Sequence, residues 1–292
     1  MKLSIVTINY NGFESTIKLL NSLSEQTDKD FQTIVIDNAS EEADFNNLQS
    51  TKCTFAKVPF VVRNEENLGF SGGNNVGIRR ALENGSEWIL LLNNDTWVEK
   101  DFISALKAKL GDLRGVVGVP LVEDGQAAYA GKIQWLKVTL EHARLRPIIR
   151  HRKSDNYVIG GGVAIHRNVF EKIGLLDEKY FLYFEDADFS LKTQRAGFPL
   201  AVLEEPKAYH QVSSTTKKLG PSLLLRYHYR NSLYFNWKNG PWHIKLLIWP
   251  WSFWIIKKQL LKIMFMHKQE DSLAILKGVF DFYRNKMGRI DL

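Results

Sequence analysis

The sequence predicts an α/β protein with a mostly parallel, Rossmann-like sheet flanked by helices. Short apolar runs typical of strands recur through the first 165 residues, and stretches with helical periodicity lie between them. This alternation favours a parallel sheet, because the crossovers between parallel strands are usually helical. Ligands of such sheets bind beyond the carboxyl ends of the strands, so the residues that follow each strand are candidates for a site.

The bulk composition is that of a globular protein. The 292 residues are 45% hydrophobic and 24% charged, which is enough apolar material for a large core in one or two domains. The single cysteine, Cys53, excludes an intramolecular disulfide framework and a cysteine-based zinc site. The opening residues MKLSIVTINYNG read as a strand, without the basic and apolar segments of a signal peptide. We therefore expect a reducing, cytoplasmic setting.

The first predicted strand and helix set the pattern for the chain. Residues 3–8 form an apolar run, and residues 13–26 place Ile17, Leu20 and Leu23 on one helical face. The other predicted strands are 33–37, 60–62, 88–92, 116–119, 157–165 and 200–205, and the other predicted helices are 72–85 and 186–195. The run at 88–92 is apolar at all five positions, which indicates a strand buried on both faces.

Small polar residues follow four of the predicted strands. They are residues 9–12, 37–40, 63–75 and 93–96. Loops are often polar, but four such strand ends with acids or amides indicate one ligand site at a shared edge of the sheet. Asp37 can accept hydrogen bonds from a nucleobase or a ribose hydroxyl, and it can equally serve as an N-cap or in an Asx-turn. Its spacing alone does not decide between these roles.

Residues 67–75, NLGFSGGNN, form a glycine-rich segment that opens a helix. Glycines let a backbone approach a ligand closely, and a helix N-terminus favours an anion. The spacing matches neither a dinucleotide fingerprint nor a Walker loop. It does match G-x-S-x-G around Ser71, which predicts as an alternative a serine hydrolase with His210 as its base. The polar stretch between the strand at 60–62 and Gly69 is long for a nucleophile elbow, which weakens that alternative.

Asp95 stands directly after the buried strand at 88–92, preceded by Asn93 and Asn94. A carboxylate flanked by amides suits a hard divalent cation that also holds phosphate oxygens. The two amides can add neutral oxygen ligands or ribose contacts. The alternative is an N-cap for a helix over 98–110.

Residues 180–198 place three carboxylates, Glu185, Asp186 and Asp188, among aromatic residues at the start of a helix. A helix N-terminus stabilises carboxylates, which is the structural interpretation. The functional interpretation is a general base, since a partly buried carboxylate with acidic neighbours can take a proton. His210 follows the strand at 200–205, and a lone histidine there matters only if it lies near Asp95.

These motifs occur in the order found in the inverting glycosyltransferases of family 2, which the sequence resembles from residue 3 to about residue 214. The resemblance is carried by SIVTINYNG, VIDNAS, NLGFSGGNNVGI, LLLNNDT and IGLLDEKYFLYFEDADFSLKTQRAGF. The chain looks most like the bacterial branch that includes rhamnosyltransferases. The resemblance implies a GT-A fold with a catalytic domain over 1–216, divided into a nucleotide-binding half, 1–96, and an acceptor-binding catalytic half, 97–216.

The resemblance also implies roles for individual residues. Asp186 matches the catalytic base, Asp37 would contact the nucleobase, and Asp95 with His210 would hold Mg²⁺ or Mn²⁺. The remaining residues implied to line the nucleotide pocket are Asn9, Asn67, Gly69, Gly72, Asn74, Asn93 and Asn94. This sequence keeps only the last acid of the family's D-x-D metal motif, so we expect the donor's diphosphate to supply much of the metal coordination.

The reaction that the resemblance implies moves a sugar from a nucleotide diphosphate sugar to a hydroxyl in cell-surface polysaccharide synthesis. The branch points to dTDP-rhamnose as donor and to a glycan or a polyprenyl-diphosphate-linked acceptor. Two other classes compete. A sugar nucleotidyltransferase should carry a glycine-rich, arginine-containing loop after its first strand, and NYNGFES lacks one. A non-catalytic sugar-nucleotide binder would show no turnover that depends on Asp186.

Residues 217–292 are basic, with 14 of the 39 Lys/Arg but 4 of the 32 Asp/Glu. Their longest uncharged run, 246–256, is shorter than the ~20 residues of a membrane-spanning helix and contains Pro250. We predict an amphipathic helical extension that lies on an anionic membrane at the inner face of the cell membrane. The alternatives are a helical cap on the core or a dimer contact. No nucleic-acid motif accompanies the basic residues, so we expect no nucleic-acid partner, and Arg230 is predicted to face a lipid-linked diphosphate.

Overall fold

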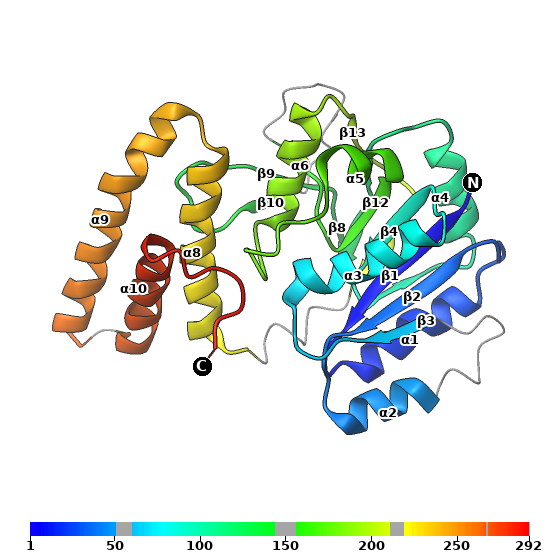
Figure 1. Ribbon diagram of the computed structural model, residues 1–292, viewed down its shortest axis with the longest axis horizontal. Coiled ribbons are helices and arrows are strands. Elements are labelled where there is room, and N and C mark those ends of the chain that lie inside the picture. The colour runs from blue at the N-terminus through cyan, green and yellow to red at the C-terminus, as the bar shows by residue number, and fades with distance from the viewer. Residues whose placement is uncertain (51–59, 144–155, 211–218, 267, 292) are drawn as a thin grey trace.

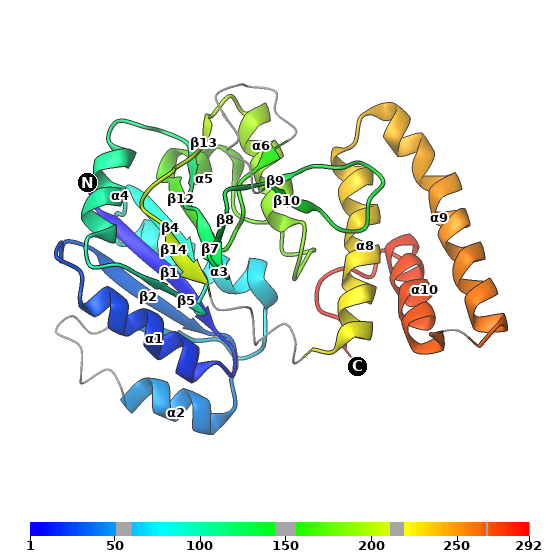
Figure 2. The ribbon, with the colours of Figure 1, turned by 180° about the vertical axis from the view of Figure 1, so that it is seen from behind.

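The computed structural model describes residues 1–50, 60–143, 156–210, 219–266 and 268–291. Cys53 and the predicted domain boundary at 216 lie outside these residues. A central sheet carries helices on both faces, and three C-terminal helices stand to one side of it (Figures 1 and 2). The predicted α/β architecture is therefore confirmed.

The main sheet has seven strands in the order β13-β6-β12-β4-β1-β2-β3. Their bounds are β1 Leu3–Asn9, β2 Gln32–Asp37, β3 Phe60–Arg63, β4 Trp88–Leu92, β6 Val116–Gly118, β12 Gly162–His166 and β13 Leu200–Val202. β1 runs parallel to β2 and β4, whereas β12 runs antiparallel to its neighbours β4 and β6. The mostly parallel sheet predicted from the sequence is present, with β12 as an antiparallel exception.

Two helical layers bury alternate residues of the central strands, because successive side chains of a strand point to opposite faces. The helices are α1 Phe13–Ser24, α2 Glu42–Ser50, α3 Gly69–Glu83, α4 Phe102–Leu110, α5 Arg167–Ile173 and α6 Glu185–Arg195. Ile5 joins a cluster with residues of α1 and α4, whereas its neighbour Val6 joins a cluster with residues of α3 and α5. Gly77 lets α3 approach the sheet closely, since a Cβ there would lie 2.2 Å from Cγ1 of Val6.

The run predicted as one strand over 157–165 divides into two. β11, Asn156–Tyr157, pairs with β9 in a three-stranded sheet, and β12 joins the main sheet. The break includes Gly160 and Gly161, and β12 begins at the next glycine, Gly162. Because β12 is antiparallel to β4, its glycine-rich amino end lies at the carboxyl edge of β4, where the Asn93 amide donates to Gly161 O at 3.0 Å.

Short strands form two smaller sheets with orders β10-β9-β11 and β5-β14-β7-β8. Their bounds are β5 Thr96–Val98, β7 Leu121–Glu123, β8 Gln126–Ala128, β9 Ala130–Lys132, β10 Glu141–Ala143 and β14 Ala208–His210. β5 occupies the first residue of the helix predicted over 98–110, so α4 begins later, at Phe102. The strand predicted over 200–205 ends earlier, at Val202.

The C-terminal region consists of α8 Pro221–Asn239, α9 Trp242–Met264 and α10 Gln269–Tyr283. α8 caps the body: Phe235 belongs to the main core cluster, and the ring of Tyr227 stacks on Phe181 at 5.3 Å. α9 and α10 pack on α8 through a separate cluster that includes Leu233 and Ile248. Within the described residues, no helix is both long and apolar enough to cross a membrane.

Candidate active site

A cavity opens at the carboxyl edge of the parallel strands, where the sequence predicts a site. Its walls come from the ends of β1, β2 and β4, the start of α3, Gly160, and the segment that precedes α6. The predicted site residues that line it are Asn67, Gly69, Asn74, Asn93, Asn94 and Asp95. Tyr10, Asn38, Phe70 and Phe181 also line it; they lie within segments that the sequence analysis singled out, but it gave none of them an individual role.

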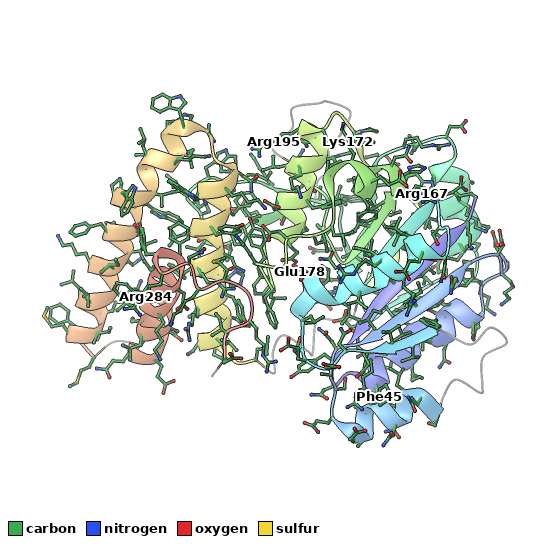
Figure 3. The ribbon with its side chains drawn as sticks, in the orientation of Figure 1. Phe45, Arg167, Lys172, Glu178, Arg195 and Arg284 are labelled. Atoms are coloured by element: carbon green, nitrogen blue, oxygen red, sulfur yellow. The ribbon has the colours of Figure 1, made fainter. Side chains whose placement is uncertain are left out.

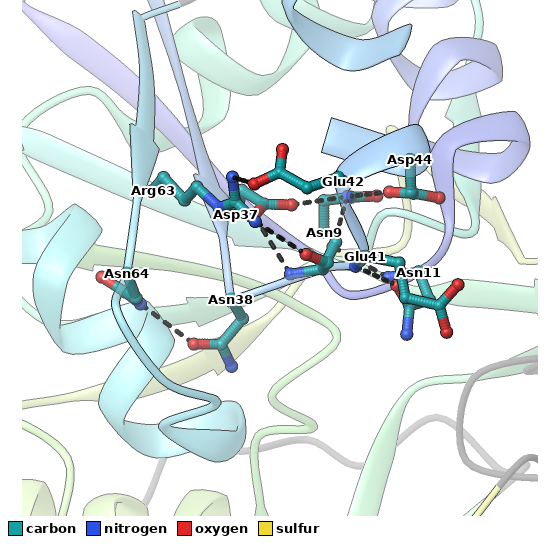
Figure 4. Close-up of polar contacts among 10 residues, drawn as sticks. Asn9, Asn11, Asp37, Asn38, Glu41, Glu42, Asp44, Arg63 and Asn64 are labelled. Carbon is teal, nitrogen blue, oxygen red and sulfur yellow. Dashed lines mark hydrogen bonds and ion pairs between the residues drawn. The ribbon is translucent and has the colours of Figure 1, made fainter. Parts of the chain in front are cut away.

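Asn9 and Asp37 lie behind the cavity in a buried network that joins the ends of β1 and β2 (Figure 4). Asn9 Nδ2 donates to Asp37 Oδ1 at 3.0 Å and to Asp44 Oδ1 at 2.7 Å. Asp37 Oδ2 accepts from the Ser40 amide at 3.1 Å and lies 3.7 Å from Nε of Arg63. This is the turn-forming role left open for Asp37, and its contact with a nucleobase stays a prediction.

Asn38, next to Asp37, fastens the loop before α3 to the sheet edge. Its Oδ1 accepts from Asn64 Nδ2 at 2.9 Å (Figure 4) and from the Leu68 amide at 3.1 Å. Its Nδ2 donates to Asn67 Oδ1 at 2.9 Å and to Gly69 O at 3.1 Å. Asn38 therefore positions Asn67 and Gly69 at the cavity, and the available sequence signal was a second polar side chain directly after the strand.

α3 begins at Gly69, three residues earlier than predicted, so Ser71 and Gly72 lie in its first turns. Gly69 has φ +70°, and a Cβ there would lie 2.4 Å from Phe181 O, which restricts the position to glycine. Gly72 is buried against Leu68 and is not among the residues that line the cavity. Ser71 is fully buried within the helix, which contradicts the serine-hydrolase alternative because a nucleophile elbow exposes its hydroxyl.

Asp95 and His210 face each other, as their predicted shared role requires. Pairing of β14 with β5 places His210 opposite Thr96, next to Asp95. Asp95 Oδ1 lies 3.0 Å from His210 Nε2, and His210 Nδ1 lies 2.5 Å from Glu123 Oε1. Burial lowers the pKa of His210, but the neighbouring Asp95 and Glu123 carboxylates outweigh it and raise that pKa. The motifs gave no signal for Glu123, which comes from β7.

The facing atoms of Asp95 and His210 fit a cation. Both are buried, and neither has an aligned hydrogen-bond partner among the described residues, although they lie 3.0 Å apart. Two ligands at right angles and about 2.1 Å from Mg²⁺ would be about 3 Å apart. Within the described part of the chain, no group of three His, Cys, Asp or Glu side chains could hold a metal. Further ligands would therefore be neutral oxygens, such as those of Asn93 and Asn94, or oxygens of a bound molecule.

Asp186 lies in the first turn of α6, against the wall of the cavity. Its Oδ2 accepts from the amide of Gly160, a residue that lines the cavity, at 3.2 Å. The two neighbouring carboxylates, Glu185 and Asp188, have other roles. Burial is the main cause that raises the pKa of Glu185 well above its usual range, and the charge of Asp186 is the second. Asp188 accepts from Lys238 Nζ at 2.8 Å, which ties α6 to α8.

The ends of α6 and α8 are also joined. Arg195 (Figure 3), in the last turn of α6, donates to Asn239 Oδ1 at 2.9 Å and to Asn239 O at 2.7 Å. Asn239 Nδ2 in turn donates to Asp188 Oδ1 at 2.6 Å. α8 therefore fixes the orientation of the helix that carries Asp186.

The aromatic segment before α6 is held in an unusual backbone conformation by α8. Phe181, Tyr183 and Phe184 have φ of 62°, 71° and 75°, which non-glycine residues rarely adopt. Asn231 Nδ2 donates to Tyr180 O at 2.9 Å, Leu182 O at 2.7 Å and Tyr183 O at 3.3 Å. Sequence reasoning missed Asn231, although it assigned a role to the neighbouring Arg230.

Arg230 supports the same segment. It is 1% exposed, and its Nη2 donates to Tyr180 O at 3.3 Å while its Nε donates to Asn231 Oδ1 at 3.0 Å. The prediction that Arg230 faces a lipid-linked acceptor is therefore wrong. Its guanidinium instead donates inside the protein, to the backbone carbonyls of Tyr180 and Lys286 and to the side-chain amide of Asn231.

The fold and this site define a class of protein: a glycosyltransferase with the GT-A fold. The profile named Glycosyl transferase family 2 matches residues 4–174, more than half of the chain. The chain belongs to glycosyl transferase family 2, which confirms the resemblance seen in its motifs, and it is a glycosyltransferase enzyme.

Two relatives are named as rhamnosyltransferases. The chain is 24% identical over 218 residues to the dTDP-rhamnosyl transferase RfbF of Shigella flexneri, an alignment that covers 73% of this chain and 70% of the relative. It is 21% identical over 277 residues to the N-acetylglucosaminyl-diphospho-decaprenol L-rhamnosyltransferase of Mycobacterium tuberculosis, covering 85% and 88%.

Solved structures share the fold. Staphylococcus aureus TarS 1-349 in complex with UDP-GlcNAc has a TM-score of 0.55 and 15% identity, covering 100% of this chain and 94% of that one. The mannosyltransferase PcManGT from Pyrobaculum calidifontis, in complex with GDP-Man and Mn²⁺, has a TM-score of 0.57 and 13% identity, covering 97% and 87%. At these identities the likeness establishes the fold alone, and it confirms the GT-A fold.

Proposed function

We propose that this enzyme is an inverting transferase that moves a sugar from a nucleotide diphosphate sugar to an acceptor hydroxyl, with Asp186 as general base. The observation that carries the proposal is the arrangement of the cavity wall. Asp95, paired with His210, lines the cavity, and Asp186 is bonded to the wall residue Gly160. Asp186 does not itself line the cavity, but its bond to Gly160 supports a charge-holding pair and a proton acceptor that act at one site.

The chemistry assigned to these side chains is a single displacement. Asp186 takes the proton of the acceptor hydroxyl while the hydroxyl oxygen bonds to the anomeric carbon. The bond from that carbon to the diphosphate breaks, and the nucleoside diphosphate leaves with the electron pair. Because the hydroxyl attacks from the face opposite the diphosphate, the anomeric configuration inverts. A Mg²⁺ or Mn²⁺ held by Asp95 and His210 would offset the negative charge of the leaving group.

The nucleotide half of the donor is assigned to the edge residues Asn67, Gly69, Asn74, Asn93 and Asn94. Two of these are held in place by the fold. Asn94 Nδ2 donates to the hydroxyl of Thr16 at 2.9 Å, and Asn67 Oδ1 accepts from Asn38. Asn9 and Asp37 would act from behind this edge, by fixing the ends of β1 and β2 or, after rearrangement of their network, by direct contact with the base.

We further propose rhamnose, carried by dTDP, as the sugar transferred and a glycan or polyprenyl-diphosphate-linked acceptor in cell-surface polysaccharide synthesis. The names of the relatives from Shigella flexneri and Mycobacterium tuberculosis support both choices. The location that suits such an acceptor is the inner face of the cell membrane. A thermal-shift screen of nucleotide sugars, with and without Mg²⁺ or Mn²⁺, tests the donor: stabilisation by another sugar nucleotide, and none by dTDP-rhamnose, would exclude this choice.

The test of the catalytic role is Asp186→Asn, with Glu185→Gln as its matched control. We expect Asp186→Asn to lower turnover by ~10²–10⁴ and to leave nucleotide binding nearly intact, measured by calorimetry. Glu185→Gln should keep most of the turnover, because burial already favours the uncharged form of Glu185. Turnover that survives in Asp186→Asn would assign the general base to another residue, and parallel loss of binding would contradict the assigned role.

A further inference from the structure

Large apolar side chains cover the outer face of α9. Trp242, Leu246, Trp249, Phe253, Leu260 and Met264 are each between 54% and 74% exposed. Their spacings are three, four or seven residues, which return to the same face of a helix, so they form one stripe, which we call the outer stripe. The opposite face of α9, with Ile244, Ile248 and Ile255, is buried, and α9 packs there on α8 and α10. α9 is therefore apolar on two faces, of which one is covered.

Apart from a ring contact of Trp249 with Tyr283 of α10 at 5.1 Å, nothing in the described fold covers the outer stripe. Figures 1 and 2 show α9 at the end of the molecule farthest from the sheet, with α8 and α10 on its inner side. Proteins that remain monomeric in water rarely expose a contiguous apolar patch of this kind without a binding role. We therefore expect the outer stripe to bind a partner.

The charges beside the stripe indicate the chemistry of that partner. Residues 242–264 contain four lysines and no Asp or Glu. Lys257, Lys258 and Lys262 share a shallow groove with Trp254, Leu261 and Phe265, and Lys258 Nζ lies 4.9 Å from the Trp254 ring centroid. None of the three lysines pairs with a carboxylate of the described residues. A surface that offers both hydrocarbon and phosphate would satisfy the stripe and the groove together.

We propose that the outer stripe of α9 docks on an anionic lipid bilayer, with the helix lying in the plane of the interface. The apolar side chains would enter the boundary between headgroups and acyl chains, and the groove lysines would contact lipid phosphates. Tryptophan suits this depth because its ring is apolar and its N–H is polar. A second copy of the chain fits less well, because a symmetric contact through α9 would bring its lysines together.

This inference deepens the proposed function by naming its partner surface, but its test does not need turnover. The purified full chain is floated with vesicles of phosphatidylcholine alone and of equimolar phosphatidylcholine and phosphatidylglycerol. We expect flotation with the anionic vesicles, and binding that weakens as salt is added. Trp249→Ser combined with Phe253→Ser should reduce vesicle binding by at least about tenfold. Neutralising Lys257, Lys258 and Lys262 with Gln should reduce it on the order of 100-fold on anionic vesicles.

Matched controls separate docking from general surface effects. Trp237→Ser removes a half-exposed tryptophan of α8 outside the outer stripe, and it should bind vesicles like the parent chain. Gln substitutions of Lys100, Lys109 and Lys172 remove three lysines of the catalytic body and should also leave binding unchanged. Circular dichroism melts establish that each variant is folded.

The proposal is overturned if the parent chain does not float with anionic vesicles, or if folded stripe and groove variants bind as it does. It is also overturned if the chain forms a concentration-dependent dimer that the stripe variant abolishes, since the stripe would then be an interface between copies. Flotation that persists in Asp186→Asn, which should lack turnover, would separate this inference from the proposed catalytic role.

Discussion

Replacing Asn231 by alanine tests how the segment before α6 is held. The side chain is fully buried in α8, and its Nδ2 serves three carbonyls, those of Tyr180, Leu182 and Tyr183. The substitution removes these bonds and leaves the carbonyls without their partner. It also deprives Arg230 Nε of the Asn231 Oδ1 acceptor.

The expected loss of stability follows from the number of bonds and their quality. The contacts at 2.7 and 2.9 Å are good hydrogen bonds worth ~1 kcal/mol each, and the contact at 3.3 Å adds less. Carbonyls left unpaired in the interior raise the loss, so we expect the free energy of unfolding to fall by about 3 kcal/mol. The left-handed residues of the segment each carry ~1 kcal/mol or more of strain, which the segment can release by relaxing once it is freed.

Urea unfolding and steady-state kinetics measure the two effects. Relaxation of the segment should displace Asp186, and a displacement of ~1 Å costs on the order of 100-fold in turnover. The matched control is Asn236→Ala, which removes a fully buried side chain of the same helix that bonds Leu136 N at 2.9 Å and Ser232 O at 2.7 Å. The control should lose similar stability but keep its turnover within about threefold. Equal loss of turnover in both variants would refute a positioning role for Asn231.

Three further outcomes are expected. Asp95→Ala should weaken Mn²⁺-dependent donor binding by ~10-fold or more in calorimetry, and unchanged metal dependence would remove Asp95 from the metal site. Gly77→Ala should lower stability by about 2 kcal/mol by overpacking α3 against the sheet, whereas Gly125→Ala, with nothing within 4 Å, should cost only about 1 kcal/mol for its positive φ. Burial lowers the pKa of His228 to about 4, so the unfolded chain binds the proton more readily. Stability should fall as the pH drops from 6.5 towards 4, by about 3 kcal/mol, and urea titrations of His228→Phe, but not of exposed His243→Phe, should lack this loss.

The sheet and much of the site could be predicted from the sequence because their signals are local. The apolar run Trp88–Leu92 and the polar residues that follow it are contiguous, and the ends of parallel strands meet at one edge. Asp95 and the glycine-rich segment were therefore placed near one another without any knowledge of pairing. Ser71 was open to misinterpretation because the G-x-S-x-G pattern does not reveal that the helix begins at Gly69.

The rest depended on contacts between distant segments, which no local pattern encodes. Glu123 reaches His210 because β7 and β14 pair in a small sheet. Asn231 and Arg230 reach the segment before α6 from some fifty residues away. An arginine in a basic segment is expected at the surface. That Arg230 is buried could be recognised only from the structure, in which backbone carbonyls accept its hydrogen bonds.

The position of α8 has a consequence for dividing the chain. A fragment ending at 216 would lack Phe235 from the main core and the amide of Asn231, so its sheet and its acid-bearing helix would both lose support. A fragment ending at 240 would retain both but would discard α9, α10 and the residues after them, of which Ile290 packs with Phe181 and Tyr227 and Gly288 N donates to Lys179 O at 2.8 Å. If α9 docks on a membrane as proposed, a graft that replaces the pair α9 and α10 but keeps these last residues would redirect the enzyme to a different surface and leave the support of the segment before α6 in place.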